Sequence, residues 1–146
     1  MNNINYKIIS LSENTIQLLE KLRYNAYGMD PNSFPVEKTY HTKQLKEGKY
    51  LVFGCFLNNQ LVGACYTSKT HNSLYIEQLF IKKEYQNTQL HLGTNLLIYI
   101  LENKQIVEDY FQTKFNYSYL DNYKDTTNLY QSIGYHKTGT IMKKRI

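Results

Sequence analysis

The sequence has little of what marks secreted, disulfide-stabilised or membrane-spanning proteins. Its 146 residues include only two cysteines, which allow at most one disulfide. No apolar run approaches the roughly 20 residues that a helix needs to cross a bilayer. The N-terminal segment lacks a basic stretch followed by an apolar core, so no secretory signal is visible and we expect a cytoplasmic protein.

The two cysteines fall in a predicted β-hairpin with residues 58–59 at its tip. In that register Cys55 faces Val62 and Cys65 faces Val52, and the alternation of side chains directs the two thiols to opposite sides of the sheet. We therefore expect two free thiols in the interior. The four histidines show no metal-ligand spacing, so no metal site is predicted.

The composition fits one soluble globular domain over residues 1–146. Hydrophobic residues make up 42% of the chain and charged residues 20%, which is typical of a folded protein rather than a disordered one. The net charge of +5 could suit a nucleic acid, an anionic membrane or an anionic cofactor. Because the lysines are scattered along the chain, a solubilising surface explains the charge better. We predict neither a nucleic-acid partner nor a membrane partner.

Hydrophobic periodicity and turn signals predict the element order β-α-α-β-β-β-α-β-α-β-β. This order predicts an α/β protein, with an α+β mixed sheet and helices on both faces. Ser10 and Glu13 form a candidate capping box for the first helix, with Ser12 as the alternative cap. Segment 105–110 is ambiguous. The predicted strands are 6–9, 50–57, 60–67, 74–81, 111–119 and a final strand or hairpin in 135–145 that turns at 138–139, and the predicted helices are about 13–27, 37–47, 93–103 and 124–133.

The stretch 74–103 contains a candidate anion site. Its first part, 74–81, is an apolar run rich in β-branched and aromatic residues, which indicates a buried strand. After a polar connection, Leu96 and Ile100 recur at helical spacing behind Gly93. The N–H groups at a helix start have no intrahelical partners, and the helix dipole adds a partial positive charge there. A strand, a loop and a helix start in this order suit a phosphate or pyrophosphate.

Two segments match parts of a known family. The segment LFIKKEYQNTQLHLGTNLL is similar to a strand 4, pyrophosphate loop and helix 3, and NLYQSIGYHK is similar to an "LY…GF" element through Leu129, Tyr130, Gly134 and Tyr135. Together with the element order, they make the chain resemble the GCN5-related N-acetyltransferase (GNAT) family over nearly its whole length.

The loop departs from the family pattern, which usually reads Gln/Arg-x-x-Gly-x-Gly/Ala. Counted back from Gly93, this chain has Thr88 at the Gln/Arg place and His91 at the first glycine. Counted from Gln86, the loop is two residues longer. The phosphate-binding donors in such a loop are backbone N–H groups, so it can still work with altered geometry. The Asn-x-x-Ala that commonly precedes "LY" is also missing.

The resemblance implies acetyl-CoA as co-substrate. In such a domain the backbone of Leu79, Phe80 and Ile81 would hydrogen-bond the pantetheine arm as a pseudo-strand. The main-chain amides of the loop would hold the pyrophosphate, and these belong to Thr88, Gln89, Leu90, His91, Leu92, Gly93 and Thr94.

The resemblance also implies two catalytic residues. Acetyl transfer to an amine needs a base for the amine's proton and an acid for the departing thiolate. Glu77 stands where some family members carry a catalytic glutamate, and its apolar neighbours would raise its pKa. Tyr130 matches the tyrosine that often acts as general acid. A purely structural role stays open for each residue. Glu77 can be an ion-paired or edge-facing residue, and Tyr130 can simply pack in the core.

An acceptor pocket in this architecture would lie between the first two helices and the loop of residues 28–35. Tyr27 and Phe34 are the candidate substrate-binding aromatics there, although packing of an irregular loop explains them equally well. The predicted function is transfer of an acetyl group to a primary amine of a small molecule or peptide, by direct attack in a ternary complex. The alternative is a non-catalytic acyl-CoA-binding or regulatory domain. A homodimer is an option, and a basic nucleic-acid-binding module ranks last.

Overall fold

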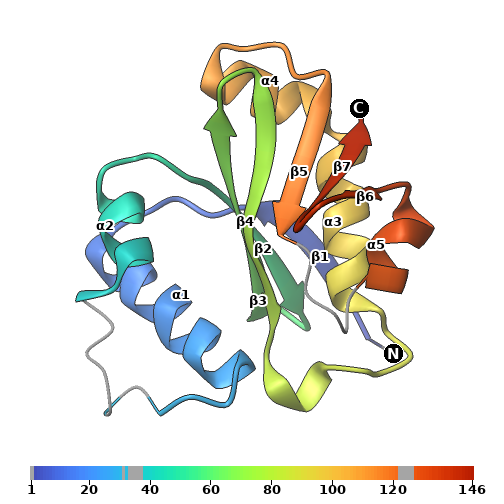
Figure 1. The fold of residues 1–146 in the computed structure, drawn as a ribbon. Coiled ribbons are helices and arrows are strands. Elements are labelled where there is room, and N and C mark those ends of the chain that lie inside the picture. The colour runs from blue at the N-terminus through green and yellow to red at the C-terminus, as the bar shows by residue number, and fades with distance from the viewer. Residues whose placement is uncertain (1, 31, 33–37, 122–126) are drawn as a thin grey trace.

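The computed structural model describes residues 2–30, 32, 38–121 and 127–146, and these form a seven-stranded sheet with helices on both faces (Figure 1). The strand order is β1-β2-β3-β4-β5-β7-β6, in which β4 and β5 are parallel and the other neighbours are antiparallel. The strands are β1 (Ile4–Ile8), β2 (Leu51–Leu57), β3 (Gln60–Thr70), β4 (Ser73–Ile81), β5 (Tyr117–Asp121), β6 (His136–Thr138) and β7 (Ile141–Arg145). The helices are α1 (Glu13–Ala26), α2 (Tyr40–Lys46), α3 (Leu92–Glu102), α4 (Lys104–Phe111) and α5 (Thr127–Ile133), with a 3₁₀ turn η2 (Lys83–Tyr85) before α3.

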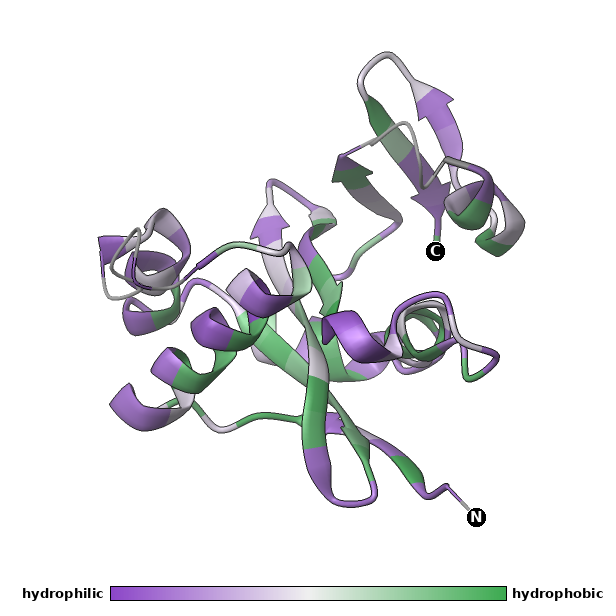
Figure 2. Cartoon of the chain, turned by 90° about the horizontal axis from the view of Figure 1, so that it is seen from below, coloured by the Kyte–Doolittle hydropathy of each residue, from purple (hydrophilic) through white to green (hydrophobic). Residues whose placement is uncertain are grey.

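A hydrophobic core lies on each face of the sheet. On one face Leu19 of α1 packs with Tyr66 and Phe80, and on the other Leu96 and Ile100 of α3 pack against the strands. The central strands are mainly hydrophobic (Figure 2). The predicted fold class, a mixed sheet with helices on both faces, is therefore confirmed.

The ambiguous segment 105–110 is helical, and the strand predicted for 111–119 begins only at Tyr117. The alternating aromatics that suggested the strand instead make a turn, in which the Phe111 and Phe115 rings meet edge-on with centroids 6.0 Å apart. The Glu108 carboxylate accepts a hydrogen bond from the Phe115 N–H at 2.7 Å and fixes this turn. Tertiary packing therefore decides the structure of a segment whose local pattern fits a strand.

The first helix begins at the alternative cap. Ser12 and Thr15 form the capping box, in which the Ser12 N–H donates to Thr15 Oγ1 at 2.7 Å and the Ser12 side chain accepts from the Thr15 N–H at 3.3 Å. The capping box expected from Ser10 and Glu13 is therefore wrong, because Glu13 already lies inside the helix. The second helix is shorter than expected and is capped by Thr39.

The hairpin between β2 and β3 has the predicted tip but a shifted register. A β-bulge after Cys55 pairs it with Gly63 and pairs Cys65 with Phe53. Both thiols consequently pack in the same hydrophobic core, and the expectation that they point to opposite sides is wrong. Both are free and buried, as predicted. Burial raises the pKa of the Cys55 thiol to about 11 and that of Cys65 further.

A buried polar cluster joins α1, α2 and β3. The Glu20 carboxylate is fully buried and accepts hydrogen bonds from Arg23 Nε at 2.8 Å, Thr39 Oγ1 at 2.5 Å and Tyr66 OH at 2.9 Å. Burial by itself raises the pKa of Glu20, but these donors and the positive charge of Arg23 outweigh it and lower the pKa overall. The cluster fixes the position of α2 against the sheet, since Thr39 is also the cap of that helix.

Candidate active site

Strands β4 and β5 separate part-way along their length. They pair from Ser73 to Ile76 of β4 against Tyr117 to Leu120 of β5. Beyond Ile76, β4 pairs only with β3 among the described strands. One edge of the last part of β4 is therefore free of a neighbouring strand and can hydrogen-bond an extended ligand.

The register shows which main-chain groups face this gap. The Lys82 N–H donates to the Val62 carbonyl at 2.7 Å, and Phe80 pairs with Ala64. Alternation along an antiparallel ladder then turns the main-chain groups of Phe80 toward β3 and those of Leu79 and Ile81 toward the gap. The predicted pseudo-strand contacts remain available to Leu79 and to the N–H of Ile81, whose carbonyl already accepts a hydrogen bond from the Gln86 side chain. For Phe80 the register does not support a main-chain contact, because β3 already uses those groups.

A cavity of about 460 Å³ lies at this end of β4, between the 3₁₀ turn, the start of α3, the end of α1 and α5. A larger hollow of about 800 Å³ between the N-terminal part of α1, α2 and α4 contains none of the predicted site residues. Gln89 is exposed and Leu90 packs against the core, so neither side chain reaches the cavity. The predicted residues that line it are Leu79, Phe80, Ile81, Thr88, His91, Leu92, Gly93, Thr94, Tyr130 and Tyr27.

The start of α3 presents free donors to the cavity. Among the described residues, none accepts a hydrogen bond from the main-chain N–H groups of Leu92, Gly93 or Thr94. His91 is the N-cap and has a left-handed backbone, φ 49°, at the place where the family pattern has its first glycine. The start of α3 thus has the free N–H donors that an anion site needs, although Gly93 is the loop's single glycine.

Gln86 fastens the loop to its surroundings. Its side-chain amide donates to the Ala26 carbonyl at the end of α1 and to the Ile81 carbonyl at the end of β4, both at 2.7 Å. The Lys83 N–H also donates to Asn25 Oδ1 at 3.1 Å. The sequence left two registers open for this loop, and the structure gives Gln86 rather than Thr88 the anchoring bonds. The bonds to Ala26 and Asn25 were not foreseen because these partners are distant in sequence.

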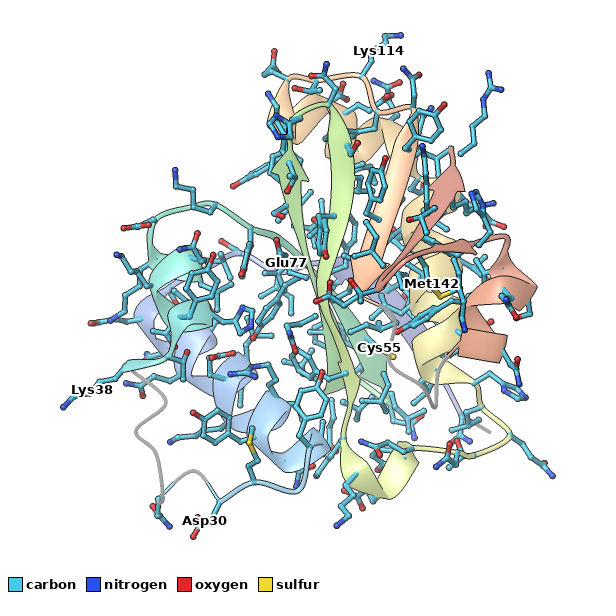
Figure 3. All side chains as sticks on the ribbon, viewed as in Figure 1. Asp30, Lys38, Cys55, Glu77, Lys114 and Met142 are labelled. Atoms are coloured by element: carbon cyan, nitrogen blue, oxygen red, sulfur yellow. The ribbon has the colours of Figure 1, made fainter. Side chains whose placement is uncertain are left out.

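Glu77 occupies a β-bulge in β4. Tyr66 pairs with Gln78 and Thr67 pairs with Ile76, so Glu77 is the extra residue between them. Bulges redirect side chains and are frequent next to active sites. Glu77 lies near the centre of the molecule, with α1 and α2 on one side and β5 on the other (Figure 3).

The surroundings of Glu77 make its carboxylate more basic than an ordinary one. Its carboxylate accepts a hydrogen bond from Ser68 Oγ at 2.6 Å. Burial raises the pKa of Glu77, the negative charge of Asp121 raises it further, and the bond from Ser68 partly opposes them. Ser68 and Asp121 were not predicted as site residues, because neither lies near Glu77 in the sequence. Glu77 is half-buried, and a raised pKa makes its carboxylate a better proton acceptor than an ordinary one.

Tyr130 lines the cavity from α5. It is only 8% exposed, and its ring meets the Tyr135 ring edge-on with centroids 6.2 Å apart. The Tyr135 hydroxyl is held by Ser118 Oγ at 2.8 Å. Tyr130 is thus both a packed aromatic and a residue of the cavity wall, so its two predicted roles are compatible.

Of the two residues predicted to bind the acceptor, the structure describes one, Tyr27. The Tyr27 hydroxyl donates to Gln78 Oε1 at 2.9 Å, which places Tyr27 at the rim of the cavity beside β4. Phe34 lies outside the described residues. The acceptor side also contains a pair missed by sequence reasoning, His41 Nδ1 and Tyr50 OH, 2.8 Å apart, and the charge of Glu77 contributes to the raised pKa of Tyr50 after burial.

Solved structures with the same fold include several N-acetyltransferases. The PaiA N-acetyltransferase of Thermoplasma acidophilum, in complex with coenzyme A, is 18% identical with a TM-score of 0.66 over 97% of this chain and 99% of that one. The ribosomal-protein-S18-alanine N-acetyltransferase of Escherichia coli is 16% identical with a TM-score of 0.68 over 100% and 94%. A GNAT family acetyltransferase of Elizabethkingia anophelis with acetyl-CoA bound is 12% identical with a TM-score of 0.65 over 99% of both chains. The chain therefore has the acetyltransferase fold.

The family follows from the sequence itself. The model of the acetyltransferase (GNAT) domain matches residues 30–145, and the chain belongs to the GNAT family, whose enzymes use acetyl-CoA. A search of curated proteins found no match. Within the described part of the chain, no helix is long and apolar enough to cross a membrane, and no group of three or more His, Cys, Asp or Glu side chains could hold a metal ion.

Proposed function

We propose that the chain is an acetyl-CoA-dependent N-acetyltransferase that acetylates a primary amine by direct attack in a ternary complex. The observation that carries the proposal is the combination of unbonded amides at the start of α3 with the free edge of β4. Acetyl-CoA is an extended anion with an amide-containing arm, so it needs donors at one end and a strand edge along its length. The cavity joins these two features.

The residues that would hold acetyl-CoA follow from this geometry. The N–H groups of Leu92, Gly93 and Thr94 would bind the pyrophosphate, and the main-chain groups of Leu79 together with the N–H of Ile81 would bind the arm. The bound molecule supplies an acetyl thioester, which an amine can attack without a metal or a covalent enzyme intermediate.

Two side chains would then move the protons. Glu77, directly or through water, accepts the proton that the amine loses as its nitrogen bonds to the acetyl carbon. As the carbon–sulfur bond breaks, Tyr130 donates its hydroxyl proton to the sulfur and later regains one from solvent. The raised pKa makes the Glu77 carboxylate a better proton acceptor than an ordinary glutamate.

Calorimetric titration with acetyl-CoA and a thiol-release assay over a panel of amines test this proposal. We expect binding, release of coenzyme A with at least one amine, and a lower kcat for Tyr130→Phe at unchanged acetyl-CoA affinity. Tyr110→Phe on α4 is the matched control, since that hydroxyl bonds the Gly48 carbonyl away from the cavity. No binding heat and no thermal shift with acetyl-CoA would refute the proposal.

The second candidate is a non-catalytic acyl-CoA-binding domain. Its supporting observation is His91, whose left-handed backbone replaces the glycine of the family pattern and leaves a side chain at the rim of the cavity. Binding of acetyl-CoA without thiol release across the amine panel would favour this candidate.

A further inference from the structure

The face of the sheet that α1 and α2 cover continues over β5 and β7, where no described helix lies on it (Figure 1). Tyr117 is 37% exposed there, and Asp121 and Arg145 are exposed as well. We call this surface the open face. Alternation along the strands gives it the side chains of Tyr75 on β4, Tyr117, Tyr119 and Asp121 on β5, and Lys143 and Arg145 on β7.

One end of the open face is acidic. Asp121 at the end of β5 accepts a hydrogen bond from the Tyr75 hydroxyl and acts electrostatically on Glu77. Glu77 itself is bonded to Ser68 on the same face of the sheet. This end therefore attracts a cation and lies beside the group that is proposed to take the amine's proton.

The other end is basic and aromatic. Lys143 Nζ lies 4.0 Å from the centre of the Tyr117 ring and 5.6 Å from that of Tyr119. Arg145 pairs with Tyr117 across the strands. Among the described residues, no carboxylate forms a salt bridge with Lys143 or Arg145. Two cations at a flat tyrosine surface are thus free to receive an anion.

The spacing between the two ends follows from the strand register. Asp121 lies opposite Ile141, and Lys143 lies opposite Tyr119. One strand step and two residues separate Asp121 from Lys143, which is about 8 Å between α-carbons. A ligand that reaches both ends is therefore the size of a small metabolite.

We propose that the open face selects an acceptor charged at both ends, namely a small-molecule amine that carries a carboxylate or phosphate several bonds from its nitrogen. The amine lies toward Glu77 and Asp121, and the anion lies on Lys143 and Arg145. The tyrosines pack against the part between them. This inference rests on the proposed N-acetyltransferase function, and it adds the chemical class of the acceptor.

The test compares kcat/KM for 6-aminohexanoate, 6-aminohexyl phosphate and hexylamine at low ionic strength. We expect both anionic amines to be preferred over hexylamine by about 3- to 10-fold, and the preference to decline with salt. Lys143→Met should bring the ratio close to 1. Lys144→Met is the control, because it removes the same charge from the same strand while its side chain lies on the opposite face, next to Gly134.

The outcomes separate this inference from the proposed function. Acetylation of hexylamine without any preference, or a preference that Lys143→Met and Lys144→Met reduce equally, overturns the inference and leaves the proposed function standing. If none of the amines is acetylated, the proposed function fails for these amines. Calorimetry with 6-aminohexanoate then tests the open face alone. The absence of binding heat in that titration overturns the inference. Stronger competition by a single-stranded oligonucleotide than by inorganic phosphate assigns the face to nucleic acid and also overturns it.

Discussion

Removal of the Gln86 side chain, which lines the cavity and anchors the loop, should weaken acetyl-CoA binding. Its amide makes two hydrogen bonds of 2.7 Å, one to Ala26 and one to Ile81, and so ties the loop to α1 and to β4. Each such bond contributes about 0.5–1.5 kcal/mol. Because Gln86 is half-buried, water can replace part of what is lost, and we expect Gln86→Ala to cost about 1–2 kcal/mol.

This cost divides between stability and affinity. A loosened loop must be ordered again on binding, so we expect acetyl-CoA to bind roughly 5- to 30-fold more weakly if the whole cost appears in affinity. Titration calorimetry measures the affinity, and the thermal midpoint measures the remainder.

Gln89→Ala is the matched control for this prediction. Gln89 is the same residue type in the same loop, but it is exposed and does not line the cavity. We expect the affinity of Gln89→Ala for acetyl-CoA to stay within about 2-fold of that of the parent chain, as for other substitutions at exposed positions. Equal loss in Gln86→Ala and Gln89→Ala, or no loss in either, would refute the anchoring role of Gln86.

Further predictions concern the proposed base Glu77, the buried cluster around Glu20, and the packing at Gly63 in the sheet. Asp121→Asn should move the acidic limb of the kcat–pH profile to lower pH and Ser68→Ala should move it to higher pH, because the first removes a charge that raises the Glu77 pKa and the second a bond that lowers it. Glu20→Ala should lower the free energy of unfolding by about 3–5 kcal/mol at neutral pH, because it leaves a buried cation unpaired. The parent chain should lose stability as pH falls below 4.5, the ordinary pKa of Glu20, since its folded-state pKa is lower. Gly63→Ala should cost about 1–3 kcal/mol, because a β-carbon there would lie 2.7 Å from a main-chain oxygen of β4.

Each of these predictions has a control within the chain. If both substitutions beside Glu77 leave the acidic limb in place, Glu77 is not the titrating base. The pH dependence assigned to Glu20 should be absent from Glu20→Gln, and its persistence would point to another carboxylate. Gly93→Ala should change the thermal midpoint far less than Gly63→Ala, because the nearest atom to an added β-carbon is 3.5 Å away. Equal destabilisation would contradict the packing argument.

The fold could be predicted largely from local patterns. The hairpin tip at residues 58–59, the strand that ends at Ile81 and the amphipathic stripe of α3 are periodic features with clear turn signals, and each appears in the structure. The segment after α3 could not be assigned in this way. The alternation from Phe111 to Tyr119 fits a strand, but Val107 and Phe115 are buried in a helix-and-turn arrangement that depends on packing against distant strands.

The site was only partly predictable for the same reason. Glu77 and Tyr130 were predicted from the family motifs, and their catalytic roles stay predictions. The bulge that holds Glu77 and the partners Ser68 and Asp121 are products of strand pairing, which a single sequence does not encode locally. Gln86 was visible as an alternative start of the loop, yet its partners lie on α1 and β4.

The most direct test of the account compares the affinity of acetyl-CoA with that of S-acetylpantetheine, which has the thioester arm but no pyrophosphate. If the N–H groups at the start of α3 hold the diphosphate, acetyl-CoA should bind at least about 10-fold more tightly, as expected for two or three charge-assisted hydrogen bonds at a helix start. Equal affinities, or no binding of acetyl-CoA, would contradict the account.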